Sequence, residues 1–162
     1  MSAPLLIPTG LAHVEQFVGI DDVLAAWVLQ CNIVAAGSCR AGEMPNDPTY
    51  PFVMFTRVGG GDDRVTDYPS VDADIFHPDI TVASTVGDRV HRAIKALKPR
   101  GLAQRPTVLA PVDLDDGTTA SVPFVVDRIE VVDYPTLRDY EDDSVKRFVG
   151  RYRIEHRCTA AQ

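Results

Sequence analysis

Apolar residues near the start of the chain recur at helical spacing. They are Ile20, Val23, Leu24, Trp27, Val28, Cys31 and Val34. Such a stripe predicts an amphipathic helix that buries one face. Asp21 or Asp22 is suited to cap its start, and Gly37 is suited to end it. Cys31 lies within the stripe, so we expect it to pack in the core rather than to react.

A second stripe predicts a helix over residues 81–98. It consists of Val82, Val86, Val90, Ala93, Ile94 and Leu97, while Asp88, Arg89, Arg92 and Lys95 lie off it. Thr81 is a candidate cap, and residues 98–101, with Pro99 and Gly101, stop the pattern.

Four further segments predict strands, because β-branched and aromatic residues alternate with polar ones. The first pair runs over residues 51–58 and 68–76, and the second over 122–132 and 144–157. Residues 38–50 are predicted to form a loop, the Pro-rich stretch around residues 106–111 has no assigned element, and 134–143 reads as an acidic connection.

The predicted order is therefore α-β-β-α-β-β within a single domain, residues 1–162. This order predicts an α+β fold with two helices packed on one face of a mostly antiparallel sheet. The first two strands would form a projecting β-hairpin.

The tip of this hairpin carries Gly59, Gly60, Gly61, Asp62, Asp63 and Arg64. A phosphate-binding loop is the competing interpretation, but such a loop feeds a helix N-terminus and is usually followed by Lys. Here two aspartates, which repel phosphate, and another strand follow the glycines. A hairpin tip that contacts a partner is the better hypothesis.

Composition argues against several functional classes. The net charge is −7, from 23 acidic and 16 basic residues, which disfavours broad binding of nucleic acid or anionic membrane. The three cysteines, Cys31, Cys39 and Cys158, match no zinc spacing and indicate a reducing, intracellular environment. No apolar run is long enough for a membrane helix, and the first residues do not resemble a signal peptide.

Catalytic chemistry is not evident in the sequence. The histidines (His13, His77, His91 and His156) have no ligand at metal-binding spacing, and we expect them to be solvent-facing or hydrogen-bonded. The acidic pairs, including Asp72 with Asp74, read as solvated carboxylates rather than as an acid–base pair. No nucleophile elbow is present. We therefore expect no catalytic residue, cofactor or metal.

The strongest polar signal is on the last predicted strand. Arg147, Arg151, Arg153 and Arg157 alternate with an opposite face that holds Tyr152, Ile154 and His156. This arginine face is either solvated or meets acid, from another subunit or from DNA. The acidic excess of the chain favours a protein, with Asp72 and Asp74 or residues 139–143 of a neighbouring copy as the acid.

Four stretches together resemble tail terminator proteins of long, non-contractile-tailed (siphovirus-type) actinobacteriophages. They are RVGGGDDR at 57–64, VTDYPSVDADIF at 65–76, TVGDRVHRAI at 85–94 and YEDDSVKRFVGRYRI at 140–154. The resemblance extends from the first helix to the last strand, and its weight lies in the order of the motifs.

This resemblance implies a structural virion protein without enzymatic activity or cofactor. The family forms a ring, expected to be hexameric, that caps the head-proximal end of the tail tube, stops its polymerisation and offers the head-docking surface. The implied partners are further copies, the tail tube protein and a head–tail connector or completion protein. DNA only passes through the lumen, no membrane is involved, and assembly takes place in the host cytoplasm.

Two alternatives remain open. A head–tail stopper or completion protein of similar fold would bind the portal-side adaptor instead of the tube. A small ligand-binding domain or enzyme would need a deep pocket with convergent polar groups.

Overall fold

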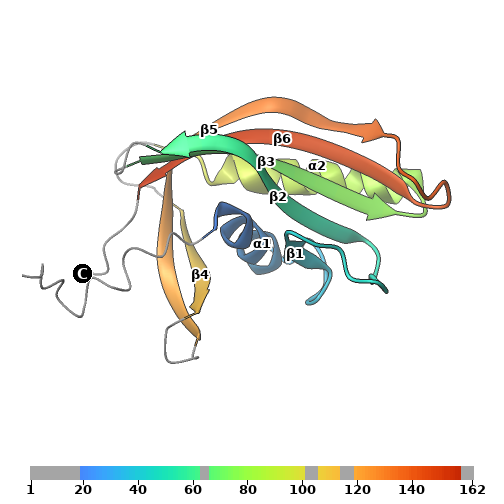
Figure 1. Ribbon diagram of the computed structural model, residues 1–162, viewed down its shortest axis with the longest axis horizontal. Coiled ribbons are helices and arrows are strands. Elements are labelled where there is room, and N and C mark those ends of the chain that lie inside the picture. Colours follow the sequence, from blue (N-terminus) through green and yellow to red (C-terminus); the bar gives the residue numbers. More distant parts are fainter. Residues whose placement is uncertain (1–18, 63–65, 101–105, 114–118, 158–162) are drawn as a thin grey trace, which may run out of the picture.

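The computed structural model describes residues 19–62, 66–100, 106–113 and 119–157 (Figure 1). Two helices and six strands follow one another in these ranges. Their order is α1 (Ile20–Gln30), β1 (Cys39–Ala41), β2 (Phe52–Asp62), β3 (Thr66–His77), α2 (Ile80–Ala96), β4 (Thr107–Asp113), β5 (Thr119–Arg138) and β6 (Lys146–Arg157). The α+β class is as predicted, but the order α-β-β-α-β-β is wrong, because a strand was missed on each side of α2.

The six strands form one sheet in the order β1-β2-β3-β6-β5-β4. Neighbouring strands are antiparallel except β1, which pairs parallel to β2, so the sheet is mixed. The hairpin of β2 and β3 is present, but it does not stand free. β3 pairs with β6 along its length, from His77 opposite Lys146 to Thr66 opposite Arg157.

β1 and β4 explain the wrong order. β1 has only three residues, too few for an alternation to be recognised, and it lies where Gly42, Pro45 and Pro48 predict a loop. β4 contains Pro111, and proline in a strand argues against pairing unless the strand is at an edge. β4 is such an edge strand, so the proline is tolerated.

β5 is longer than its predicted range, 122–132, and extends into the expected acidic connection. Its pairing with β6 shifts register at three places between Val126 and Thr136. Each β-bulge adds a residue and reverses the face of the side chains that follow. Figure 1 shows the first part of β5 turning away together with β4, and β4 lies beside α1.

α1 ends at Gln30, earlier than the predicted end at Gly37. Asn32 has a φ of 51°, and its amide donates to Leu29 O while the Ile33 amide donates to Val28 O. This pair of bonds is a Schellman motif, which closes a helix around a left-handed residue. Ile33 and Val34 are still buried, but in the turn after the helix. The start is also corrected, because the N-cap is Gly19, without a side-chain hydrogen bond, and not Asp21 or Asp22.

α2 starts one residue before the prediction, and its cap is Asp79 rather than Thr81. The Asp79 carboxylate accepts hydrogen bonds from the amides of Thr81 and Val82, at 2.7 and 3.1 Å. These bonds, with that to Val82 the larger cause, lower the pKa of Asp79. The helix buries the predicted stripe except Val82, which is exposed.

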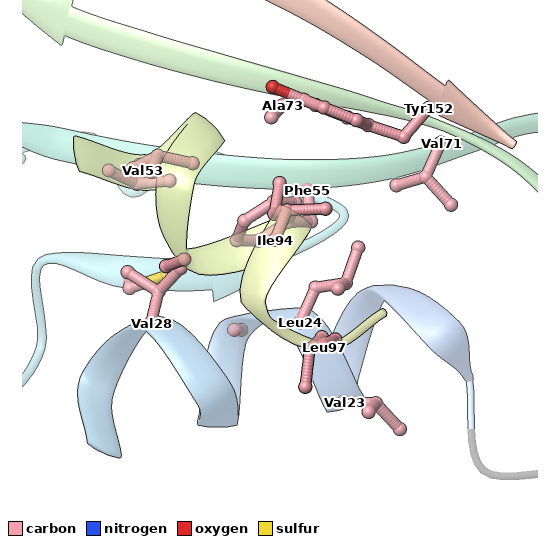
Figure 2. Packing of buried hydrophobic residues seen from close by; sticks show 14 of the residues in the cluster. Val23, Leu24, Val28, Val53, Phe55, Val71, Ala73, Ile94, Leu97 and Tyr152 are labelled. Atoms are coloured by element: carbon pink, nitrogen blue, oxygen red, sulfur yellow. The ribbon is translucent and has the colours of Figure 1, made fainter. Parts of the chain in front are cut away.

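Both helices pack on one face of the sheet, as predicted, and share one core with it. Figure 2 shows Val23, Leu24 and Val28 of α1 and Ile94 and Leu97 beside Val53, Phe55, Val71, Ala73 and Tyr152 of the sheet. The Trp27 indole Nε1 donates to Ala93 O at 2.8 Å and joins the two helices. Cys31 packs against this core, as expected. Cys39 is buried, which raises the pKa of its thiol to about 12.

Candidate interaction surface

The sheet face opposite the helices carries the ion pairs of Arg147, Arg151 and Arg153. Strand alternation places Asp72 and Asp74 of β3 and Arg147 and Arg151 of β6 on this outer face, while Ala73 and Tyr152 point to the core. The outer face is therefore polar because the helices already bury the apolar one.

Two ion pairs join β3 and β6 on the outer face. Arg151 forms a bidentate pair with Asp72, with Nε–Oδ1 at 2.6 Å and Nη2–Oδ2 at 2.8 Å. Arg147 donates through Nε to Asp74 Oδ1 at 2.7 Å. Bidentate geometry fixes a guanidinium in orientation as well as in place.

The carboxylates of both pairs are buried, contrary to the expectation of solvated acids. Asp72 is 8% exposed and Asp74 2%. Burial raises the pKa of Asp74, although the hydrogen bond and the charge of Arg147 oppose the rise. The hydrogen bonds that Arg151 donates to Asp72 raise the pKa of Arg151. Within the chain, the acid that meets Arg147 and Arg151 thus comes from β3.

Arg153, the third predicted contact residue, is held more loosely. Its Nη1 lies 3.3 Å from Glu130 Oε2 of β5, and both side chains are about half exposed. Such a pair contributes little to stability.

A groove of about 290 Å³ lies between these strands. Its lining residues are Asp72, Asp133, Arg138, Arg147, Val149 and Arg151. Arg138 is directly opposite Arg147 in the pairing of β5 with β6. Arg138 is not recognisable from the sequence, because the acidic run that follows it hides the end of a strand.

One end of the outer face is closed by a small apolar cluster. Phe52, Phe76 and Val145 form its buried part, and Met44, Tyr50, Met54 and Tyr140 pack around them. Phe76 stacks edge-on against Tyr140, with ring centroids 5.2 Å apart. The loops 42–50 and 139–145 thereby cover this end, next to Arg147 and the groove.

The other end of the sheet holds the glycine hairpin. Gly60 has a φ of 109°, and a Cβ there would lie 2.2 Å from Tyr68 O, so only glycine fits. A Cβ at Gly59 or Gly61 would meet nothing within 4 Å. Asp62 ends β2 opposite Asp67, while Asp63 and Arg64 lie outside the described residues.

A charge cluster with a buried carboxylate and a buried histidine anchors the base of this hairpin on the core side. Arg57 makes a bidentate pair with Asp67, with both distances 2.8 Å. His156 Nε2 lies 3.3 Å from Asp67 Oδ2, although the two groups are not aligned for a hydrogen bond, and Nδ1 has no partner. The ring is 2% exposed and stacks on Phe124.

Two of the described histidines are buried: His91 is hydrogen-bonded, as expected, whereas His156 is neither solvent-facing nor hydrogen-bonded. His91 lies inside, with Nδ1 3.0 Å from the Tyr152 hydroxyl and its ring 4.7 Å from that of Tyr134. Burial lowers the pKa of both histidines, for His156 against the opposing charge of Asp67. The sequence signal was present for His156, which shares a strand face with Tyr152 and Ile154.

The described residues contain no group of three His, Cys, Asp or Glu side chains placed to hold a metal ion. No helix in these ranges is long and apolar enough to cross a membrane. The features that characterise this surface are its ion pairs and its groove.

Comparison with solved structures finds a likeness to a virion protein. No family model matches the chain, and no curated protein matches its sequence. A chain in the virion of a native gene transfer agent particle aligns over 90% of this chain and 92% of its own length. The identity is 14% and the TM-score 0.42, values too low to establish a common fold.

Proposed function

We propose that this chain is a structural virion protein that assembles into a ring and terminates a phage tail tube. The observation that carries the proposal is the outer sheet face. No helix of the described residues covers it, and ion pairs to β3 orient Arg147 and Arg151 beside a groove. Pre-oriented charges set partner choice and register in assemblies.

The order of the sequence motifs supports the tail terminator as the specific role. The α+β architecture with both helices on one face agrees with the fold that this resemblance implies. In this proposal the ring, expected to be a hexamer, sits at the head-proximal end of the tail. It contacts the tube protein on one side and a connector or completion protein on the other, and DNA passes through its centre.

The hairpin end is the proposed contact to the tube or to the adjacent subunit. It lies at one extremity of β2 and β3, and Asp62 and Asp63 supply negative charge there. Replacing both aspartates with Lys should leave the fold intact and give tails of uncontrolled length.

The matched control for this variant is Glu43→Lys with Asp47→Lys. It makes the same change of charge in an exposed loop at the other end of β2. Tail lengths are measured by electron microscopy of assembled particles. Normal lengths in the hairpin variant, with the control also normal, would exclude the hairpin from termination.

A stopper or completion protein at the head is the second candidate. It shares the proposed fold and differs in its partner. Co-purification with the tail tube protein supports termination, whereas binding only to the portal-side adaptor supports the stopper.

A further inference from the structure

The sheet has an incompletely paired edge on each side. On one side, β4 pairs with residues 119–125 at the start of β5. The remainder of β5, residues 128–138, pairs with β6 alone among the described strands. On the other side, β1 pairs with residues 53–55 of β2, and residues 56–61 pair with β3 alone within the described part of the chain. Each edge therefore leaves backbone amides and carbonyls open to a further strand.

The two open stretches lie at the same level across the sheet. Val131 of β5 is opposite Tyr152 of β6. Tyr152 is opposite Val71 of β3, and Val71 is opposite Arg57 of β2. A second copy placed beside the first in the same orientation, without a shift along the strands, would therefore bring the two open stretches together.

The strand directions fit the same placement. β2 and β3, β3 and β6, and β6 and β5 are antiparallel pairs, so β5 runs opposite to β2. β5 of one copy beside β2 of the next would be a further antiparallel pair, with the helices of both copies on the same side of the joined sheet. Because the two edges differ, the contact is head-to-tail, which is the kind that closes into a ring.

The side chains of the open stretches also favour a strand as the partner. Val131, Val132 and Tyr134 of β5 are exposed. Val58 is exposed on the open part of β2. Exposed apolar edge strands pair with other chains unless proline, charge or bulges prevent it. Pro135 has no amide hydrogen and ends the stretch that can pair, and the bulge after Val131 keeps the contact short.

We propose that residues 128–134 of β5 pair antiparallel with residues 56–61 of β2 in a second copy of this chain. The backbone hydrogen bonds of this pair extend the sheet from one subunit to the next. The proposal rests on the proposed function, and it names the contact that joins the subunits of the ring.

The competing arrangement pairs β5 with β5 of a second copy around a two-fold axis. This pair is also antiparallel, but it leaves β2 open and stops at a dimer. Full overlap of residues 128–138, centred on Asp133, would place Arg128 opposite Arg138 of the second copy and Asp133 opposite itself. Like charges directly opposite one another are unfavourable in a sheet, so β2 is the better partner.

Cysteine cross-linking of the purified chain identifies the partner strand. The diagnostic variant carries Val58→Cys and Val132→Cys, in a background with Cys31→Ser and Cys158→Ser. Cys39 is buried and is retained. A short bis-maleimide reagent is added to protein at about 1 mM, where weak contacts are populated. Circular dichroism confirms that each variant is folded.

Two control variants share this background. Val58→Cys with Leu137→Cys moves one thiol to an exposed position of β5 beyond Pro135. Val132→Cys alone tests for pairing of β5 with itself. We expect a ladder of cross-linked species larger than dimers from the diagnostic variant, loss of this ladder with Leu137→Cys, and no dimer from Val132→Cys alone.

Two results would overturn the proposal. One is a diagnostic variant that gives no more cross-linked product than the Leu137→Cys control. The other is a dimer from Val132→Cys alone without larger species from the diagnostic variant, which would replace β2 with β5 as the partner. Capping is measured separately with the tail tube protein, so a ladder from a chain that caps no tube would reject the proposed function and keep this contact.

Discussion

At the scale of residues, charged side chains of the outer face contribute to the stability of the fold. Asp74 is buried beneath Arg147, whose side chain is 33% exposed. Removing one member of a buried ion pair leaves an uncompensated charge, which costs more than the pair contributes.

Arg147→Ala should therefore destabilise the chain. We expect a loss of about 2 kcal/mol, below the 3–5 kcal/mol of fully buried pairs because the guanidinium is partly solvated. Urea unfolding measures it. The double variant Asp74→Leu with Arg147→Leu should recover most of the loss, and a double variant less stable than Arg147→Ala would contradict this account.

The buried histidines predict a dependence of stability on pH. Burial lowers the pKa of His156 and of His91 below their ordinary value of 6.5. The unfolded chain then binds protons more readily than the folded one, so stability falls as the pH drops below about 6.5.

His156→Gln isolates this effect, because it retains a polar side chain of similar length next to Asp67 and Phe124. The decrease in the free energy of unfolding between about pH 7 and pH 5 should be smaller than in the wild type. An unchanged pH dependence would show that His156 is not responsible. The raised pKa of Asp74 has the opposite effect in both proteins. It lowers the free energy of unfolding as the pH rises above about 4, because the unfolded chain loses this proton first.

These residues also show where sequence reasoning fails at this scale. Alternation correctly placed Asp72 and Asp74 on the face opposite Val71, Ala73 and Ile75. It could not tell that β6 would lie alongside and cover them with arginines. Cross-strand partners depend on sheet order, which a single sequence does not reveal.

At the scale of elements, the hairpin separates glycines needed for the fold from glycines that are not. Gly60 adopts a left-handed conformation next to the backbone of Tyr68, whereas Gly59 and Gly61 have free space around them.

Gly60→Ala should be destabilising by about 2 kcal/mol or more, because strain and a clash with Tyr68 O combine. Gly59→Ala is the matched control and should be neutral or stabilising by about 0.5 kcal/mol, since glycine weakens a strand. Thermal unfolding compares the two. Equal effects would mean that the hairpin does not have the described backbone.

The helix α2 gives a further test through its cap. Asp79→Ala should lower the melting temperature, because the amides of Thr81 and Val82 lose their acceptor. Asp79→Asn keeps an acceptor and should recover part of the loss. Equal melting temperatures for Asp79→Ala and the wild type would exclude a stabilising cap.

Element types with long, regular patterns were predictable, and boundaries were not. The alternation of β6 was read correctly, and the stripes of α1 and α2 were read correctly except for Cys31 and Val34, which follow α1, and Val82, which is exposed. The end of α1 depends on a Schellman motif around Asn32, and three bulges in β5 disrupt its alternation. Both features are local backbone choices that apolar periodicity does not encode.

At the scale of the whole molecule, the fold divides its surface into two kinds. One sheet face packs against the helices and forms the core. The other face carries ion-paired side chains. The described part of the chain offers a groove of arginines and carboxylates and no cluster of metal ligands. This charged face is the basis of the proposed role in assembly.

The most direct test is to let the tail tube protein polymerise with and without this purified chain and to measure tube lengths by negative-stain electron microscopy. Termination predicts ring-shaped density at one end of each tube and shorter tubes as the ratio of this chain to tube protein rises. Tubes of unchanged length without end density would contradict it.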